Sequence, residues 1–476
     1  MLRRMPAANQ RQAAAAFLAV AALAAAALAP THPPPARDDR LNIVVILTDD
    51  QSFDTLPSDP PALPWLQSQI RDRNGHWLWF PEAFIQTPLC CPSRATILSG
   101  EFSRHTHVTS NDDGERFDDT QTVATWLHEA GYFTGLIGKY LNLYPFDRGA
   151  FIPPGWDRWV VKRNTAADTT YSNFGFVDQT VAMQTSDAAA TYATDLFADR
   201  AVDFLRTAPA ERPFFLYFAP SAPHPPWTPP SRHVGAFSGA PFPPAPSLDE
   251  RNLSDKPAWV RKLRPIDAGR GSSLVEDRRR ESETLLGVDD AVERIVGQLA
   301  ADGDLDRTVI FFLTDNGFSF GQHRIRGKRC PYEECIRTPL AVRMPGAEAR
   351  DVRGLISNAD LAPTIADLAG VRPGRPVDGQ SFAAALRGDR WTSPAGVFLE
   401  WSGDREIPPW QGVRTSDFAY IESADGTVEL YDLTGAIGAA DPFELRSRSA
   451  DPRYRATVRR LAALVRALRS RPPGRR

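Results

Sequence analysis

Two apolar runs in the chain have the pattern of buried parallel strands. Residues 42–48 (Asn-Ile-Val-Val-Ile-Leu-Thr) and residues 308–314 (Thr-Val-Ile-Phe-Phe-Leu-Thr) are continuous and rich in β-branched side chains, which is typical of strands covered on both faces. Strand-like and helix-like patterns alternate from about residue 41 to residue 370, and a helical stripe precedes the second run (Val288, Val292, Ile295, Val296 and Leu299). The chain is therefore predicted to form an α/β domain, with a mostly parallel sheet sandwiched by helices.

The pattern changes after about residue 375. Residues 412–421 and 429–433 predict antiparallel strands, and residues 454–470 predict a helix with its apolar positions on one face. We therefore expect a large domain over residues 41–375 and a smaller C-terminal subdomain of antiparallel sheet and helix over residues 376–476. Residues 220–246 are rich in proline and predict a long loop over a site. Residues 157–190 are polar and predict another insertion that faces it.

Polar residues follow both apolar runs directly. Asp49 and Asp50 come after the first run, and Asp315 and Asn316 come after the second. Ligands in open α/β sheets bind outside the carboxyl ends of the strands, so these four side chains are candidates for one site. Carboxylate and amide oxygens suit Ca²⁺ or Mg²⁺ rather than zinc. Either pair alone would also fit a helix cap or a turn.

Residues 90–94 read Cys-Cys-Pro-Ser-Arg, which fits the signature C-x-P-S-R for oxidation of the first cysteine to formylglycine. Residues 95–100 continue as Ala-Thr-Ile-Leu-Ser-Gly. On these residues, and on the aspartates in the same chain order, the chain resembles the type I sulfatase family. The resemblance covers nearly all of the mature chain, and it implies an alkaline-phosphatase-like fold and a sulfuric ester hydrolase.

The resemblance also implies a mechanism centred on Cys90. A serine nucleophile would end as a stable sulfated serine, whereas a hydrated aldehyde has two hydroxyl groups. One hydroxyl attacks sulfur, and the other later re-forms the aldehyde and expels sulfate. In the family one divalent cation, usually Ca²⁺, lies beside this residue, held here by Asp49, Asp50, Asp315 and Asn316 together with Cys90. A formylglycine-generating enzyme would be the maturation partner.

Lysine is rare in this chain, which makes two of its lysines informative. The lysines are Lys139, Lys162, Lys256, Lys262 and Lys328, among 55 lysines and arginines in total. Lys139 and Lys328 stand where the resembled family binds sulfate. An ammonium group can bind one oxyanion oxygen and donate a proton to a leaving alkoxide, which a guanidinium does poorly. The alternative for a single lysine is a solvated surface charge.

Further site residues are implied by the same resemblance. Arg94 would hold the formylglycine hydroxyl that does not attack, and His224 would contact sulfate or the leaving oxygen. Either Lys328 or His224 would protonate the leaving alcohol. His323 would shape the pocket or contact the substrate.

One position departs from the pattern of many sulfatases, which have a histidine where Leu141 stands. Asn142 is a candidate for the missing polar role, and the group that acts as base stays open. The run Gly-Lys-Tyr-Leu-Asn at residues 138–142 and Pro-Pro-Gly-Trp at residues 153–156 also occur in the N-acetylglucosamine-6-sulfatase branch. This implies a sulfated sugar as substrate, with aryl sulfates also accepted.

Two other functions compete with this interpretation. A phosphate mono- or diesterase of the same superfamily often recruits a second metal, and the sequence shows no clear extra ligand set. A non-catalytic glycan-binding protein would have no need for the C-x-P-S-R sequence. The net charge of −3 does not indicate a nucleic-acid-binding protein.

The N-terminus has the features of a targeting segment. Arg3 and Arg4 precede a stretch rich in alanine, and residues 27–29 (Ala-Leu-Ala) fit a cleavage site. We predict an export signal over residues 1–29 and a proline-rich linker over residues 30–40, with a retained N-terminal anchor as the alternative. No stable membrane span is expected, and the protein would act outside the cytoplasm. Cys330 and Cys335 could then form a disulfide or stay as two thiols.

Overall fold

The computed structural model describes residues 38–143, 151–163, 171–185 and 191–474. The chain divides into two units, residues 1–39 and residues 40–476, and the architecture below is that of the second unit. The predicted export signal and most of the predicted linker lie outside the described residues. Within the described residues, no helix has the length and apolar character needed to cross a membrane.

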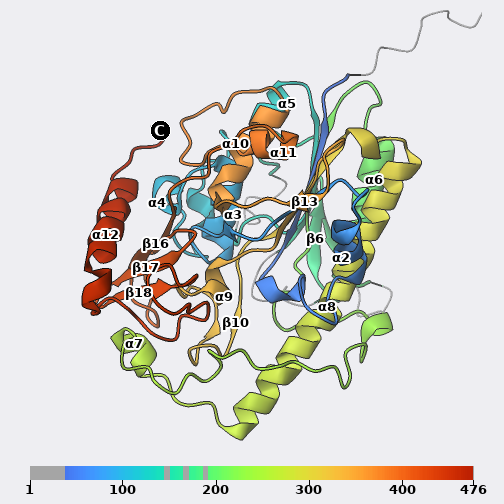
Figure 1. The fold of residues 1–476 in the computed structure, drawn as a ribbon. Coiled ribbons are helices and arrows are strands. Elements are labelled where there is room, and N and C mark those ends of the chain that lie inside the picture. The colour runs from blue at the N-terminus through green and yellow to red at the C-terminus, as the bar shows by residue number, and fades with distance from the viewer. Residues whose placement is uncertain (1–37, 144–150, 164–170, 186–190, 475–476) are drawn as a thin grey trace, which may run out of the picture. The chain divides into compact units, whose positions relative to one another are not determined.

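A ten-stranded sheet forms the centre of the second unit (Figure 1). Its strands, in spatial order, are β13 (Arg350–Asp351), β2 (Trp77–Phe80), β12 (Leu340–Arg343), β9 (Thr308–Thr314), β1 (Asn42–Thr48), β8 (Phe214–Ala219), β4 (Phe133–Gly138), β5 (Arg158–Lys162), β6 (Gly175–Asp178) and β7 (Val181–Gln184). The five strands from β9 to β5 run parallel, whereas β12, β6 and β7 pair antiparallel with their neighbours. The predicted mostly parallel sheet is confirmed.

Helices cover both faces of this sheet because alternate side chains of each strand point to opposite faces. On β1, Val45 packs in one buried cluster with α3 (Cys90–Ser99), α5 (Val123–Glu129), α10 (Leu361–Leu368) and α11 (Ala383–Arg387). Its neighbour Val44 packs in another cluster with α2 (Pro64–Arg71), α6 (Ala193–Thr207) and α8 (Ala268–Ala301). Figure 1 shows these two layers on either side of the strands. The predicted helical stripe at residues 288–299 lies within α8.

A four-stranded antiparallel sheet follows, as predicted for the C-terminal part. It consists of β15 (Val397–Trp401), β16 (Trp410–Arg414), β17 (Phe418–Ser423) and β18 (Val428–Asp432), and α12 (Arg455–Arg469) packs on it. The stretch 412–421, which predicted one strand, contains parts of two strands, because the chain turns between Arg414 and Phe418. The boundary between the two predicted domains stays a prediction.

The remaining elements are short. Two-stranded ribbons pair β10 (Ser319–Phe320) with β11 (Arg326–Gly327) and β14 (Ile356–Ser357) with β3 (Ala83–Phe84). The short helices are α4 (Ser103–Thr106), α7 (Ala258–Arg261) and α9 (Glu333–Ile336), and the 3-10 turns are η1 (Phe53–Thr55), η2 (Gly114–Arg116), η4 (Ser231–His233), η5 (Leu305–Arg307), η6 (Asn358–Asp360) and η7 (Pro452–Tyr454). A disulfide joins Cys330 to Cys335, and Cys90 and Cys91 are thiols.

Candidate active site

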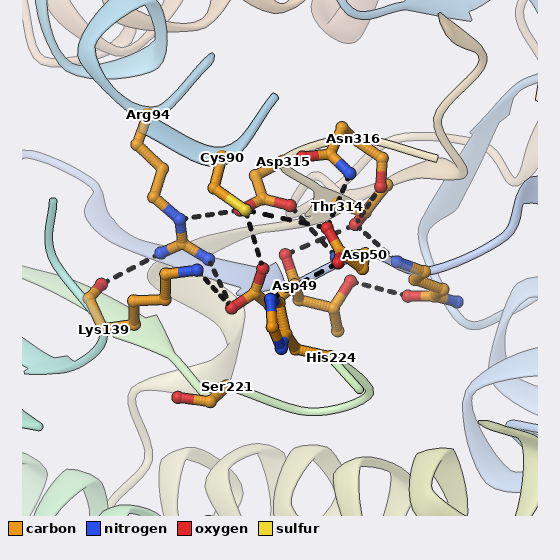
Figure 2. A network of polar contacts seen from close by, with 12 residues as sticks. Asp49, Asp50, Cys90, Arg94, Lys139, Ser221, His224, Thr314, Asp315 and Asn316 are labelled. Atoms are coloured by element: carbon orange, nitrogen blue, oxygen red, sulfur yellow. Dashed lines mark hydrogen bonds and ion pairs between the residues drawn. The ribbon is translucent and has the colours of Figure 1, made fainter. Parts of the chain in front are cut away.

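Two neighbouring parallel strands deliver the carboxylates of the site. Strands β1 and β9 pair along their full length, with Thr48 opposite Thr314, so the residues that follow them lie at the same edge of the sheet. The backbone N–H of Asp50 donates to Asp315 Oδ1 at 3.1 Å, and Asn316 Nδ2 donates to Asp50 Oδ1 at 2.7 Å (Figure 2). All four predicted oxygen ligands are buried, and their convergence matches the arrangement that the sequence predicts.

Cys90 is the first residue of α3 and points at these carboxylates. Its Sγ lies 3.4 Å from Asp49 Oδ1 and 3.7 Å from Asp50 Oδ1, and it accepts from Lys328 Nζ at 2.7 Å. The positive end of the helix dipole is directed at this residue, and Asn111 Oδ1 accepts the N–H of Cys91 in the first turn. If Cys90 is oxidised, Sγ marks the position of the formylglycine oxygens.

The unmodified thiol is a poor nucleophile in this setting. Burial raises the pKa of Cys90 well above its ordinary value, although Lys139 and Lys328 act in the opposite direction. Only the thiolate of a cysteine attacks readily.

Two ammonium groups, a buried one on Lys139 and a partly buried one on Lys328, balance the carboxylates. Lys139, directly after β4, donates to Asp49 Oδ2 at 2.6 Å, and Lys328, directly after β11, donates to both oxygens of Asp50 at 2.6 and 2.9 Å. Burial opposes the charge of Asp49 and Asp50, but these ammonium groups outweigh it and hold both pKa values below the ordinary range. The same attraction raises the pKa of each lysine against the effect of burial. Both lysines therefore pair with the strand-end carboxylates rather than standing as solvated surface charges.

Arg94, on α3, joins this helix to the ends of β9 and β4. The side chain is fully buried; its Nε donates to Asp315 Oδ2 at 2.7 Å, and its Nη1 donates to the Lys139 carbonyl at 3.0 Å. Its Nη2 lies 3.8 Å from Asp49 Oδ2 and has no hydrogen-bond partner. Burial, together with the negative charge of Asp49, raises the pKa of Asp315 to about 6, although Arg94 acts in the opposite direction.

His224 lies at the rim of the site, in the proline-rich loop after β8. Its Nε2 lies 3.6 Å from Asp50 Oδ2, its Nδ1 contacts the Pro225 carbonyl at 2.6 Å, and its side chain keeps 35% of its exposure. Tyr171 donates to the His224 carbonyl at 2.7 Å and so holds the loop. The described part of the stretch 157–190, predicted as a site-facing insertion, contributes β5, β6 and β7 to the sheet. Its sequence gave no signal for this tyrosine, because a single tyrosine there has no distinguishing pattern.

Two further candidates take other positions. Leu141 is fully buried in the core, and Asn142 is half-buried with its backbone hydrogen-bonded to the Cys91 thiol. His323 is buried in a separate cluster, where it contacts Glu250 and the ring of Tyr332. The roles predicted for Asn142 and His323 stay predictions.

The donor set fits a hard divalent cation. Asp49 and Asp50 belong to a group whose ligand atoms all lie within 4.8 Å of one another, together with Cys90 and His224. Asn316 Oδ1 is buried without a hydrogen-bond partner, and a cation is one partner that such an orphaned acceptor would take. Carboxylate and amide oxygens are the ligand types that Ca²⁺ and Mg²⁺ prefer.

The sulfatase family model matches residues 41–371 of the chain. The chain belongs to the sulfatase family. A second model, described as N-sulphoglucosamine sulphohydrolase, C-terminal, matches residues 321–471. Site and family agree, because the motif of Cys90, the strand-end aspartates and both lysines lie inside the first match.

Curated relatives support the family membership of this sulfatase. The extracellular sulfatase SULF-1 homolog of Drosophila melanogaster is 33% identical over 391 residues, which cover 78% of this chain and 34% of the relative. The N-acetylglucosamine-6-sulfatase of Capra hircus is 31% identical over 383 residues, which cover 77% of this chain and 67% of the relative. The aligned part of the chain thus spans about a third of the length of the first relative.

Solved structures show the same fold. A protein in complex with its substrate D-glucosamine-2-N,6-O-disulfate has a TM-score of 0.77 at 24% identity, covering 92% of this chain and 100% of that protein. The phosphonate monoester hydrolase of Agrobacterium radiobacter has a TM-score of 0.71 at 21% identity, covering 90% and 96%. This sulfatase therefore has the alkaline-phosphatase-like fold that its sequence predicts, and at these identities the likeness shows the fold alone.

Proposed function

We propose that the chain is an exported, Ca²⁺-dependent sulfatase that hydrolyses a sulfate ester of a sulfated sugar, with the formylglycine of Cys90 as nucleophile. The observation that carries the proposal is the position of Cys90 Sγ. This atom lies within hydrogen-bond reach of Lys328 Nζ and of both aspartates that follow β1. A nucleophile, cation ligands and a fixed positive charge thus meet at one point.

Each side chain has a task that follows from its position. Asp49, Asp50, Asp315 and Asn316 would hold Ca²⁺, which when bound supplies Lewis-acid polarisation of a sulfate oxygen. Formylglycine supplies the geminal hydroxyls for a two-step displacement. Lys139 and Lys328 offer preorganised charge to the sulfate oxygens, and Arg94 fixes the base of the site through Asp315.

The leaving alcohol departs toward the rim of the site. In an in-line displacement the leaving oxygen lies on the far side of sulfur from the nucleophile. Lys328 Nζ lies 2.7 Å from Cys90 Sγ, whereas the side chain of His224 is 35% exposed and lies within 4.8 Å of Cys90 without a hydrogen bond to it. We therefore assign protonation of the leaving oxygen to His224 and charge stabilisation to Lys328.

The names of relatives support the substrate class. One relative is an N-acetylglucosamine-6-sulfatase, and a protein of the same fold was solved with a sulfated glucosamine as its substrate. Export is supported by the pattern of residues 1–29 and by an extracellular relative. A formylglycine-generating enzyme would be the maturation partner.

The test is sulfate release from N-acetylglucosamine 6-sulfate by the protein co-produced with a formylglycine-generating enzyme. An aryl sulfate and an aryl phosphate are assayed in parallel. Release from the sugar is the expected result, and activity on the aryl sulfate alone would reject the sugar class. Inactivity on all three substrates, with formylglycine verified at Cys90 by mass spectrometry, would reject the proposal.

The second candidate is a hydrolase of phosphorus esters. It is favoured by one observation, the phosphonate monoester hydrolase of the same fold. Among the described residues, the site places one group of ligand atoms beside Cys90, whereas phosphate often recruits a second metal. A preference for aryl phosphate over aryl sulfate would make this candidate the better one.

A further inference from the structure

A second group of side chains that could bind a metal ion lies close to the segment that carries Lys328. His323, Glu334 and Glu444 each offer one ligand atom, and these atoms lie within 4.8 Å of one another. His323 and Glu334 stand on either side of Lys328 in the sequence, and Glu444 comes from the loop after β18. None of the three contributes to the site around Cys90 described above.

Three polar atoms of this group are buried without a hydrogen-bond partner. They are His323 Nε2, Glu334 Oε2 and Glu444 Oε1. The second polar atom of each side chain is already used: His323 Nδ1 contacts Glu250, Glu334 Oε1 accepts from Ser247, and Glu444 Oε2 accepts from the N–H of Glu333. His323 and Glu444 are each only 1% exposed, so bulk water does not satisfy their free atoms.

The contact between His323 and Glu250 orients the imidazole, because Nδ1 lies 2.6 Å from Glu250 Oε2. In the tautomer that carries the proton on Nδ1, this proton is donated to the carboxylate and the lone pair of the ring is on Nε2. A carboxylate that orients the second nitrogen is the usual support of a metal-bound histidine.

The surroundings carry more negative than positive charge. Glu334 Oε2 and Glu444 Oε1 are buried without a hydrogen-bond partner, and a charged carboxylate in such a position is costly. The nearest ammonium, Lys256 Nζ, donates to the Glu444 carbonyl and to the Tyr431 hydroxyl rather than to either free carboxylate oxygen. Two protons or one divalent cation would remove this cost.

We propose that His323, Glu334 and Glu444 form a second cation site, which takes a divalent transition metal such as Zn²⁺. One imidazole nitrogen and two carboxylate oxygens are suitable donors for zinc. Zinc ligands at about 2.0–2.2 Å from the ion stand about 3.3–3.6 Å apart in a tetrahedron. The ligand atoms here lie within 4.8 Å of one another, so they need to approach by about 1.2–1.5 Å at most.

Such a cation would tie two parts of the chain together. Tyr332 already donates to Glu429 of β18 at 3.0 Å, and Arg414 of β16 donates to Glu333 at 2.7 Å. The cation would add a link between the segment around Lys328 and the loop that follows β18. Lys328 would then be held by the disulfide Cys330–Cys335 on one side and by the cation on the other.

The experiment measures zinc bound to the full chain. Protein stripped with a chelator is equilibrated with Zn²⁺ in excess Ca²⁺, separated from free metal by gel filtration, and analysed by mass spectrometry of the elements. Glu444→Gln and Glu334→Gln remove one ligand each with little change in shape. Glu429→Gln is the matched control, because it removes a neighbouring buried carboxylate that is not in the group.

We expect wild type and Glu429→Gln to bind one zinc per chain more than Glu444→Gln or Glu334→Gln. Glu250→Gln should bind zinc about 10- to 100-fold more weakly, as is usual for loss of a carboxylate behind a metal-bound histidine. The comparison is a difference between variants, so zinc in the site around Cys90 cancels and the outcome does not depend on the proposed activity.

Equal zinc content in wild type and a folded Glu444→Gln would overturn the proposal. If Glu444→Gln does not fold, the comparison of wild type with Glu334→Gln decides the question. Zinc should raise the midpoint of thermal unfolding of wild type more than that of Glu334→Gln, and a wild type that retains no zinc would also overturn the proposal.

Discussion

The assignment of His224 as the acid can be separated from the charge role of Lys328 by changing the leaving group. The perturbations are His224→Ala and Lys328→Ala, each assayed on N-acetylglucosamine 6-sulfate and on an aryl sulfate. An aryl oxide leaves without a proton, whereas a sugar alkoxide needs one. Loss of an acid therefore matters for the sugar and much less for the aryl ester.

The magnitudes follow from the contacts. Positioned general acids contribute about 10²- to 10⁴-fold, so His224→Ala should lose that much kcat/KM on the sugar and about tenfold or less on the aryl sulfate. Lys328 Nζ lies 2.7 Å from Cys90 Sγ and 2.6 Å from Asp50 Oδ1, where its charge acts on any leaving group. Removal of one preorganised donor costs about 10²- to 10³-fold, and we expect a loss of this size on both substrates.

Two controls accompany the assay. Lys262→Ala removes an exposed lysine, and His128→Ala removes a side chain on α5 that is 44% exposed; neither should change kcat/KM on either substrate. The reasoning is refuted if His224→Ala lowers kcat/KM by the same factor on both esters while Lys328→Ala lowers kcat/KM more on the sugar sulfate than on the aryl sulfate. The acid would then be Lys328, and the in-line geometry inferred from the position of Cys90 would be wrong.

Four further outcomes can be checked. Cys90→Ala should release no sulfate yet keep a cooperative thermal unfolding transition, since α3 loses only one small side chain; retained turnover would contradict the nucleophile assignment. Calorimetry of chelator-stripped protein should detect Ca²⁺ binding in wild type and none in Asp315→Ala, and equal binding would contradict the ligand set. Reduction of the disulfide Cys330–Cys335, whose sequence separation is 5 residues, should lower the unfolding free energy in urea by about 2 kcal/mol, as loop-closure entropy predicts. Burial raises the pKa of Glu429 to about 7, so its contribution to stability is present below about pH 4 and is lost as the pH rises through about 7. Glu429→Gln copies the protonated form, because Tyr332 and Tyr431 both donate to Oε1. The unfolding free energy of this variant minus that of wild type, both measured in urea, should therefore rise by up to about 3 kcal/mol between pH 4 and pH 8. Parallel pH profiles would contradict the raised pKa.

The central fold could be predicted because its strands are buried on both faces. Strands β1 and β9 lack polar residues inside, and this leaves a continuous apolar run that sequence alone reveals. The aspartates at their ends could be predicted for the same reason, since the strand fixes where the chain turns. The motif at Cys90 then placed a third segment beside them through a family resemblance rather than through periodicity.

Other features of the structure have no pattern in the sequence that would predict them. Strand β7 lies at the sheet edge with all four residues exposed, so it buries nothing that would show as an apolar pattern. The turn between β16 and β17 is short, so the sequence pattern of residues 412–421 predicted one strand instead of two. The position of His323 depends on contacts with Glu250 and Glu444, which are 73 and 121 residues away in the sequence, and spacing cannot reveal them.

The burial of α3 has a consequence for timing during biosynthesis. All ten residues of this helix are buried, including Cys90 and Arg94. A second protein that reads Cys90–Arg94 as a peptide cannot reach it once the helix has packed against α10 and the strand ends. Any enzymatic modification of Cys90 therefore competes with folding, and a chain that folds first keeps its thiol. The active fraction of a preparation would therefore depend on the rate of modification relative to the rate of folding, and not on the stability of the folded protein.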